Sequence, residues 1–233
     1  MRNTGHWHWR FSAPFYRLSY IDIAHQLDED LFAYLGHRVE GAVVADCGCG
    51  PGVVTEKLLQ RGAALVFAID VNAAMLQQVR ARLPKAVATG RVLVVQRAFD
   101  TDLFLGLRDQ FPDSGGFDVM LFKRSLYVRR EQALPMLQAS VASLSPGGVL
   151  VMVHGERSLR RYAFGPGLRP TPHTAYHLFN RGISKLSEKL GIGSYTLYTQ
   201  AELLDLLRVA APGRRVELIP SQQRAYNLVA VLG

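Results

Sequence analysis

The sequence that decides the fold reads Val43-Val44-Ala45-Asp46-Cys47-Gly48-Cys49-Gly50-Pro51-Gly52. Its apolar first half predicts a buried strand over 42–45, and its second half predicts a tight turn that leads into a helix over 51–60. Glycine lets a backbone turn sharply and approach a ligand closely, and the start of a helix offers N–H groups to an anion. The stretch therefore predicts a ligand-binding turn between a strand and a helix.

Alternating strands and helices surround this turn. Apolar runs predict seven strands, over 42–45, 64–69, 91–96, 117–122, 149–154, 215–220 and 225–232. Helical periodicity predicts helices over 20–35, 51–60, 72–83 (with Asn72 as the candidate cap), 131–144 and 199–209. Because such alternation is typical of a parallel sheet covered by helices on both faces, the sequence predicts an α/β protein.

Length and composition favour one globular domain. The chain has 233 residues, of which 48% are hydrophobic and 20% are charged, close to the average for soluble domains. Apolar runs such as 147–153 are too short to cross a bilayer, and the aromatic N-terminal stretch lacks the apolar core of a signal peptide. We therefore expect a cytoplasmic protein with no membrane contact.

The two cysteines, Cys47 and Cys49, both lie inside the glycine turn. Two cysteines so close together do not predict a disulfide framework, and the spacing expected of metal ligands is absent. We expect no metal site.

A glycine-rich turn also occurs in dinucleotide-binding proteins, but their G-x-G-x-x-G pattern would need glycine where this chain has Val53. Three features make the pattern more specific. Asp46 ends the first strand, and Asp70 ends the second, twenty residues after Gly50, where a carboxylate can hydrogen-bond ribose hydroxyls. The segment Leu144-Ser145-Pro146-Gly147-Gly148 precedes the fifth strand.

Together these motifs resemble the class I S-adenosyl-L-methionine (SAM) dependent methyltransferase family, over residues 42 to about 154. The family motifs are similar to Asp46-x-Gly48-x-Gly50-x-Gly52, Ile69-Asp70-Val71-Asn72 and Leu144-x-Pro146-Gly147-Gly148. The resemblance implies SAM as the cofactor and a Rossmann-like, mostly parallel seven-stranded sheet with a helical or irregular cap.

The resemblance also implies a role for each cofactor residue. The backbone at Gly48 and Gly50 would contact the methionine part of SAM, with Asp46 near its ammonium group, and Asp70 would hold the ribose. The loop after the third strand would flank the adenine. The remaining expected contacts are Gly52, Val71, Ala98, Phe99, Asp100 and Phe122, the last on the methionine side.

One departure from the family concerns the adenine side. The family often has an acidic residue directly after the third strand, where this chain has Arg97, and Asp100 is the candidate replacement after a slight shift.

The expected domain has four parts. Residues 1–40 form N-terminal helices or a lid, 41–154 the SAM-binding core, 155–197 a cap insertion, and 198–233 a closing helix and strands. The insertion follows the carboxyl end of a strand, the side on which open α/β sheets bind ligands.

The activated methyl group of SAM leaves the protein mainly to align the acceptor and to exclude water. A general base helps when the acceptor is a hydroxyl or a protonated amine. His154 is the best-placed candidate base, because it ends the fifth strand, and the other candidates are Tyr127, Glu156, His173 and His177. The alternative for His154 is a structural role, in which it only caps the strand through hydrogen bonds.

Several reaction types are disfavoured. The chain reads Phe122-Lys123-Arg124-Ser125 after the fourth strand, without the Asn-Pro-Pro-Tyr or Asp-Pro-Pro-Tyr motif of adenine amino-group methylases. Both cysteines lie in the turn, which disfavours a cysteine nucleophile, and the fourth strand lacks the terminal acidic residue of metal-assisted catechol-type transfer.

The net charge of +8 points to the acceptor. Residues 151–190 carry seven basic and two acidic side chains, a net of +5, which would attract an anion to a cleft. An ordinary solvated basic surface is the alternative. The expected substrate-binding residues are Lys123, Arg124, Arg157, Arg160 and Arg161.

These observations favour an enzyme that methylates a small, anionic molecule without a catalytic metal. The first alternative is an RNA methyltransferase that uses the same basic residues on phosphates, although no RNA-binding motif is present. The second is a non-enzymatic SAM-binding protein, which the fold alone does not exclude.

Overall fold

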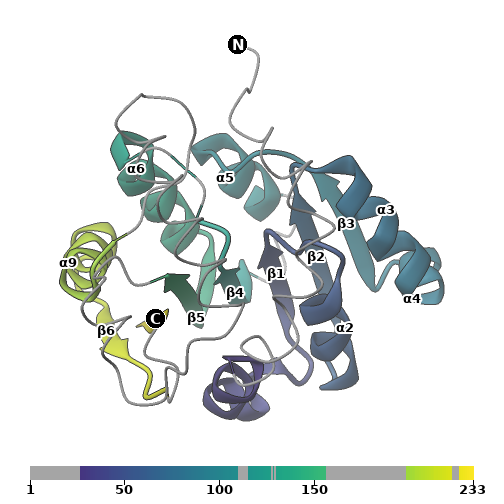
Figure 1. Ribbon diagram of the computed structural model, residues 1–233, viewed down its shortest axis with the longest axis horizontal. Helices are drawn as coiled ribbons and strands as arrows, with labels where there is room; N and C mark the ends of the chain where they lie inside the picture. Colours follow the sequence, from purple (N-terminus) through teal and green to yellow (C-terminus); the bar gives the residue numbers. More distant parts are fainter. Residues whose placement is uncertain (1–26, 110–114, 127, 129, 156–197, 222–225) are drawn as a thin grey trace, which may run out of the picture.

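The structure is a computed structural model that describes residues 27–109, 115–126, 128, 130–155, 198–221 and 226–233. These residues contain a seven-stranded sheet of order β3-β2-β1-β4-β5-β7-β6 (Figure 1). The strands are β1 (Val43–Cys47), β2 (Leu65–Asp70), β3 (Val92–Gln96), β4 (Phe117–Lys123), β5 (Leu144–Gly155), β6 (Arg215–Leu218) and β7 (Tyr226–Leu232). The first five pair in parallel, while β7 pairs antiparallel with β5 and β6. The predicted mostly parallel, Rossmann-like sheet is confirmed.

Helices cover both faces of this sheet. The described helices are 27–35, the short η2 (Gly36–Val39), α2 (Val53–Gln60), α3 (Ala73–Arg82), α4 (Pro84–Ala88), α5 (Thr101–Asp109), α6 (Arg130–Ala142) and α9 (Gln200–Ala210). Helix 27–35 and α2 pack on one face of the sheet, while α5, α6 and α9 pack on the other.

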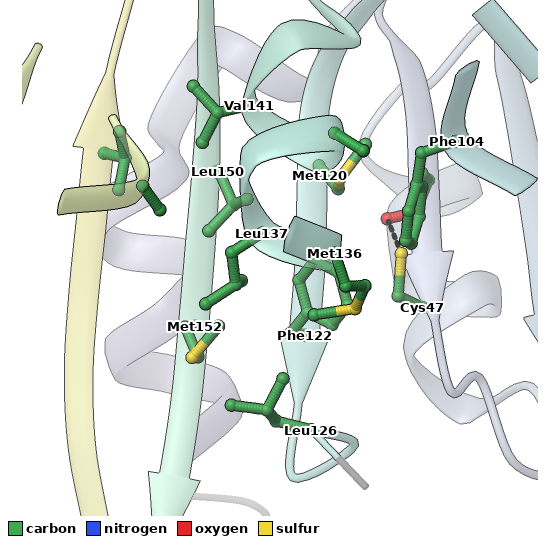
Figure 2. Close-up of a cluster of buried hydrophobic side chains, with 14 of the residues drawn as sticks. Cys47, Phe104, Met120, Phe122, Leu126, Met136, Leu137, Val141, Leu150 and Met152 are labelled. Atoms are coloured by element: carbon green, nitrogen blue, oxygen red, sulfur yellow. Dashed lines mark hydrogen bonds between the residues drawn. The ribbon is translucent and has the colours of Figure 1, made fainter. Parts of the chain in front are cut away.

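Strand β4 shows why the apolar runs are continuous rather than alternating. Met120 and Phe122 face the α5, α6 and α9 side (Figure 2), whereas Val119 and Leu121 face helix 27–35 and α2. A parallel strand that is buried on both faces needs apolar side chains at every position. The described residues therefore form a large core on each face of the sheet, with a third, smaller cluster that includes Ala68, Leu76 and Val92.

Most predicted elements are confirmed to within about two residues, and Asn72 caps α3 as predicted, accepting a hydrogen bond from the Ala74 N–H at 3.0 Å. Thr199, directly before α9, forms a capping box with Glu202. The sequence pattern does not predict the short helices α4 and α5. The first part of the predicted helix 20–35 lies outside the described residues.

The predicted start of the fifth strand is wrong. Strand β5 begins at Leu144, which pairs with Phe117, and the register then shifts so that Val149 pairs with Val119. The Pro-Gly-Gly segment is therefore an irregularity inside β5 rather than a turn before it. Gly148 is required there, since a Cβ would lie 2.6 Å from the Phe117 carbonyl oxygen.

Among the described residues, no helix has the length and apolar character needed to cross a membrane.

Candidate functional site

The candidate site lies where the strand order reverses. Strands β3, β2 and β1 follow one another in one direction from the centre of the sheet, and β4 and β5 follow in the other. Open α/β sheets bind ligands at this switch point, outside the carboxyl ends of the strands. Here β1 ends at Cys47 and the neighbouring β4 ends at Lys123, so the segments that follow these residues form the candidate site.

Three glycines shape the turn after β1, for two different reasons. Gly48, Gly50 and Gly52 have φ of +76°, +53° and +81°, in the left-handed region that favours glycine. A Cβ at Gly48 would lie 2.2 Å from the Ser125 Cβ, and a Cβ at Gly52 would lie 3.1 Å from Val79 Cγ2 on α3. A Cβ at Gly50 would meet no described atom within 4 Å. Gly48 and Gly52 therefore permit close packing, whereas Gly50 borders open space.

Hydrogen bonds tie this turn to the strands beside it. The N–H groups of Gly48 and Cys49 both donate to the Ile69 carbonyl oxygen, at 2.7 and 3.0 Å. On the other side, the Ser125 hydroxyl donates to the Cys47 carbonyl oxygen. The turn is held from β2 and from the segment after β4 at once, so its backbone N–H groups have a defined direction.

Asp70, at the end of β2, holds the same turn through its carboxylate. One oxygen accepts from the Gly50 N–H at 3.0 Å, and the other accepts from the Asn72 N–H at 2.8 Å. A carboxylate oxygen can accept more than one hydrogen bond, so these contacts are compatible with the ribose contact that the sequence predicts. Asp70 thus has a structural role in addition to the predicted one. Val71 follows it, half-buried.

Asp46 is only 1% exposed, and its carboxylate accepts from the Thr55 hydroxyl of α2 at 2.7 Å. The pKa of Asp46 is raised to about 6, mainly by burial and also by the nearby Asp70 and Asp28, against the lowering effects of the Thr55 hydrogen bond and of Lys123. The carboxylate is therefore ionised at neutral pH, as a contact with an ammonium group requires.

The loop after β3 has structural partners of its own. Asp100 is exposed, and its carboxylate accepts from the Leu103 N–H at 2.7 Å, which caps the start of α5. It also lies 3.6 Å from the Arg97 guanidinium. Ala98 is exposed between them. The adenine contact stays a prediction. Capping of α5 is a structural role that also explains an acidic residue at position 100.

Phe99 anchors this loop to the core. Its ring lies 5.6 Å from the Phe122 ring, edge to face, and 6.1 Å from the Phe104 ring. Phe122 is 0% exposed and belongs to the buried cluster of Figure 2. Any contact of Phe122 with a cofactor in this arrangement would come from its main chain.

Lys123, predicted to bind substrate, is buried on the other face of the sheet. Its side chain is 5% exposed and forms an ion pair with Asp28 of helix 27–35. Burial lowers the pKa of Lys123, and the charge of Asp28 opposes that shift. Asp28 also pairs with Lys57 of α2 at 2.6 Å. The ammonium group of Lys123 thus lies between elements of the protein.

Arg124 directly follows and has an unusual backbone. Its φ of +59° makes it the one non-glycine residue with positive φ among the described residues. Its N–H donates to the Val153 carbonyl oxygen at 2.7 Å, and its guanidinium lies 5.4 Å from the centre of the Tyr226 ring. A left-handed arginine is strained, and such strain is often found at functional sites.

His154, the predicted base, is 1% exposed at the end of β5. Its ring lies 5.4 Å from the Tyr198 ring. By strand alternation it shares the face of Met152, opposite to that of Asp46. A buried position does not by itself decide between the catalytic and the structural prediction. The other predicted substrate and catalytic residues, Tyr127, Glu156, Arg157, Arg160, Arg161, His173 and His177, lie outside the described residues, as does most of the predicted cap.

Sequence reasoning missed Asp28, Thr55 and Ser125. Thr55 lies nine positions after Asp46 on the first turns of α2, so a polar residue facing the strand end could have been sought there. Asp28 adjoins the apolar stripe of Leu27, Leu31 and Leu35, which could have marked it as a charge next to the core. No local signal marks Ser125.

The two thiols are poorly suited to chemistry. Cys47 and Cys49 are buried and not bonded to each other, and burial raises the pKa of both well above the usual range of a thiol. Within the described part of the chain, no group of three or more histidine, cysteine and acidic side chains could hold a metal ion.

Comparison with known sequences shows which proteins this chain resembles. Residues 44–148 match the family model described as a methyltransferase domain. A 58-residue stretch of the chain is 48% identical to trans-aconitate 2-methyltransferase of Afipia carboxidovorans. That stretch covers 24% of this chain and 22% of the relative, so the match spans about a fifth of the relative's length.

Two solved structures cover almost the whole chain. One is 1,6-didemethyltoxoflavin-N1-methyltransferase of Burkholderia thailandensis, with bound 1,6-didemethyltoxoflavin and S-adenosylhomocysteine. It has a TM-score of 0.57 and 21% identity, over 97% of this chain and 85% of that one. The other is magnesium protoporphyrin IX methyltransferase of Synechocystis with bound S-adenosylhomocysteine. Its TM-score is 0.59 at 16% identity, over 97% of this chain and 96% of that one. At these identities the likeness establishes the fold.

Proposed function

We propose that this chain, whose residues 44–148 match the family model of a methyltransferase domain, is a class I SAM-dependent methyltransferase that transfers a methyl group from SAM to a small anionic molecule. The matched segment contains the glycine turn, Asp46 next to the end of β1 and Asp70 at the end of β2. The observation that carries the proposal is the space beside Gly50, where no described atom lies within 4 Å of a Cβ position, next to a turn that Asp70 holds in place.

The residues of the turn fit the parts of SAM. Gly50 leaves room beside the backbone, where no Cβ blocks a ligand, and the start of α2 lies next to it. Asp70 can accept hydrogen bonds from ribose hydroxyls with its remaining lone pairs, and the ionised Asp46 would attract the ammonium group of the methionine part. When bound, SAM supplies a methyl group on a sulfonium, which is already activated for transfer.

Charge supports an anionic acceptor. The net charge is +8, and the segment 151–190 alone contributes +5, so a cleft beside it would concentrate anions. The curated relative is named for trans-aconitate, which is an anion. The 1,6-didemethyltoxoflavin and magnesium protoporphyrin IX of the structural relatives are small molecules as well.

Within the described residues, Arg124 is the best-placed cation for such an acceptor. It follows β4 at the switch point and its strained backbone is fixed by Val153. Arg157, Arg160 and Arg161 follow β5 in the sequence and are proposed to add to the same charge. His154 and Tyr127 remain the proposed candidates for a general base, if the acceptor needs one.

The test is a transfer assay with SAM that carries a labelled methyl group. Three acceptor sets are offered: small di- and tricarboxylates, their neutral esters, and total RNA. We expect label in a carboxylate and not in its ester. Label in RNA, with transfer that falls steeply as salt rises, would instead establish the RNA alternative.

Asp70→Ala provides the matching variant for that assay. It should lose two hydrogen bonds to the ribose, each worth about 0.5–1.5 kcal/mol or more because one partner is charged. The same substitution removes the acceptors of the Gly50 and Asn72 N–H groups, so the structure of the turn must be checked by circular dichroism and thermal unfolding. SAM affinity equal to that of the parent would contradict this placement.

A further inference from the structure

A buried carboxylate joins helix 27–35, α2 and the end of β4. Asp28, 3% exposed on helix 27–35, accepts from Lys57 of α2 at 2.6 Å and from Lys123 at the end of β4. Lys57 and Lys123 together carry two positive charges, and the Asp28 carboxylate neutralises one of them. Because Lys123 is the buried member and Lys57 is partly exposed, the remaining positive charge acts most strongly inside the protein.

The sheet register brings Lys123 to the side of Asp46. Asp46 pairs with Leu121 on β4, and Lys123 lies two positions further along the same strand, so all three share one face. Parallel strands lie about 4.8 Å apart and rise about 3.3 Å per residue, so two residues related in this way are roughly 8 Å apart, within reach of a long side chain. The same face carries Asp28, which closes the arrangement from helix 27–35.

We propose that Lys123 is a positioning residue of the cofactor site, whose ammonium group is fixed by Asp28 so that it faces the Asp46 carboxylate rather than the substrate. The inference rests on the proposed binding of SAM at the glycine turn. It assigns Lys123 to the cofactor half of the site and leaves Arg124 to the substrate half.

The charges around Asp46 explain why it needs this neighbour. Asp70 on β2 and Asp28 on helix 27–35 both oppose its ionisation, as burial does, and the thiols of Cys47 and Cys49 add no positive charge. Among the described residues, α2 contributes the hydroxyl of Thr55, which donates to Asp46 at 2.7 Å. With Lys123 present, the pKa of Asp46 is about 6, below neutral pH. Loss of Lys123 would move that pKa upward, and less of the carboxylate would be ionised at neutral pH.

The experiment is calorimetric titration of SAM between pH 5 and pH 7.5 with the parent protein and three variants. In the parent, affinity should fall as the pH drops through about 6, where Asp46 becomes protonated. In Lys123→Met, the midpoint of this fall should move to higher pH by about one unit. Lys123→Arg keeps the charge and should restore the parent midpoint.

Lys57→Met is the matched control, because it removes the other lysine from the same carboxylate without changing the charge beside Asp46. Its midpoint should equal that of the parent, even if its stability is lower. If Lys123→Met does not fold, Lys123→Gln takes its place, since its amide can still donate to Asp28.

The outcomes separate this inference from the proposed function. The role of Lys123 would be overturned if the fall in SAM affinity had the same midpoint pH in Lys123→Met or Lys123→Gln as in the parent. An equal shift of the midpoint in Lys57→Met would overturn it as well, and Lys123 would then have a structural role alone. Absence of SAM binding in the folded parent protein at every pH would overturn the proposed function itself.

Discussion

The two halves of the carboxyl edge of the sheet differ in how their polar groups are used. At β1 and β2, the groups form one connected unit, in which Asp70 holds the Gly50 N–H and the Ile69 carbonyl holds the N–H groups of Gly48 and Cys49. At β4 and β5, consecutive residues diverge. Lys123 is buried against Asp28, while Arg124 lies over Tyr226.

The difference shows which sequence patterns predict the positions of side chains in the folded protein. A glycine turn with strand-end acids is a local pattern, and its partners lie at fixed positions along adjacent strands. A run of basic residues after a strand is only a charge, and its direction depends on partners far away in the sequence. The half at β1 and β2, which we propose for the cofactor, is therefore determined locally, whereas the half at β4 and β5, which we propose for the substrate, depends on tertiary contacts.

The largest expected effect separates two glycines of the first half. Gly48→Ala should lower the free energy of unfolding by about 3–4 kcal/mol, because it adds a clash with Ser125 to the left-handed strain. Gly50→Ala should cost only about 1–2 kcal/mol, the strain alone. Urea unfolding of both variants makes the comparison. Equal losses would mean that the contact between the turn and the segment after β4 is not as tight as described.

Asp46→Asn should stabilise the protein above pH 6. The pKa of Asp46 is raised to about 6 in the folded protein from an ordinary value of 3.8. Between pH 3.8 and pH 6 the folded protein therefore holds a proton on Asp46 that the unfolded chain has lost. The free energy of unfolding falls as the pH rises through this range. The variant lacks this loss, which amounts to roughly 2–3 kcal/mol.

Unfolding of parent and Asp46→Asn proteins at pH 4 and pH 8 measures this effect. The gain should appear at pH 8 and shrink toward pH 4, and SAM affinity at pH 8 should fall. A gain of the same size at both pH values would exclude burial of the charge as its cause.

A smaller effect is expected at the loop after β3. Asp100→Ala should cost about 1 kcal/mol, because α5 loses its cap. Arg97→Ala is the control, and it should cost less than about 0.5 kcal/mol, since its pair with Asp100 is exposed and 3.6 Å long. Thermal unfolding compares the two. If Asp100 also contacts the adenine as the sequence predicts, its variant alone will lose SAM affinity.

The sequence predicts the sheet well because its apolar runs have strand length and its turns are marked by glycine and proline. It also predicts the position of the glycine turn and of Asp70 at the end of β2, while their contacts with SAM stay predictions. Helix α5 is missed because Gly106 interrupts its short segment. Its cap, Asp100, has an acidic side chain that the sequence pattern also allows to be a ligand contact.

The position of the Lys123 side chain could not be predicted from the sequence, for a different reason. Strand β4 is apolar on both faces, so no alternating pattern tells on which side the next residue falls. Its partner, Asp28, lies 95 positions away. Only the packing of helix 27–35 against this face of the sheet decides that the ammonium group turns inward.

The central claim is that the turn beside Gly50 is the SAM site, and calorimetric titration of SAM into Gly50→Val tests it most directly. Gly213→Val is the matched control, because Gly213 also has positive φ, at +79°, and open space around a Cβ, but it lies in the turn before β6. With native circular dichroism in both variants, we expect no detectable binding to Gly50→Val and parent affinity in Gly213→Val. Parent affinity in a folded Gly50→Val would contradict the claim and place the cofactor elsewhere.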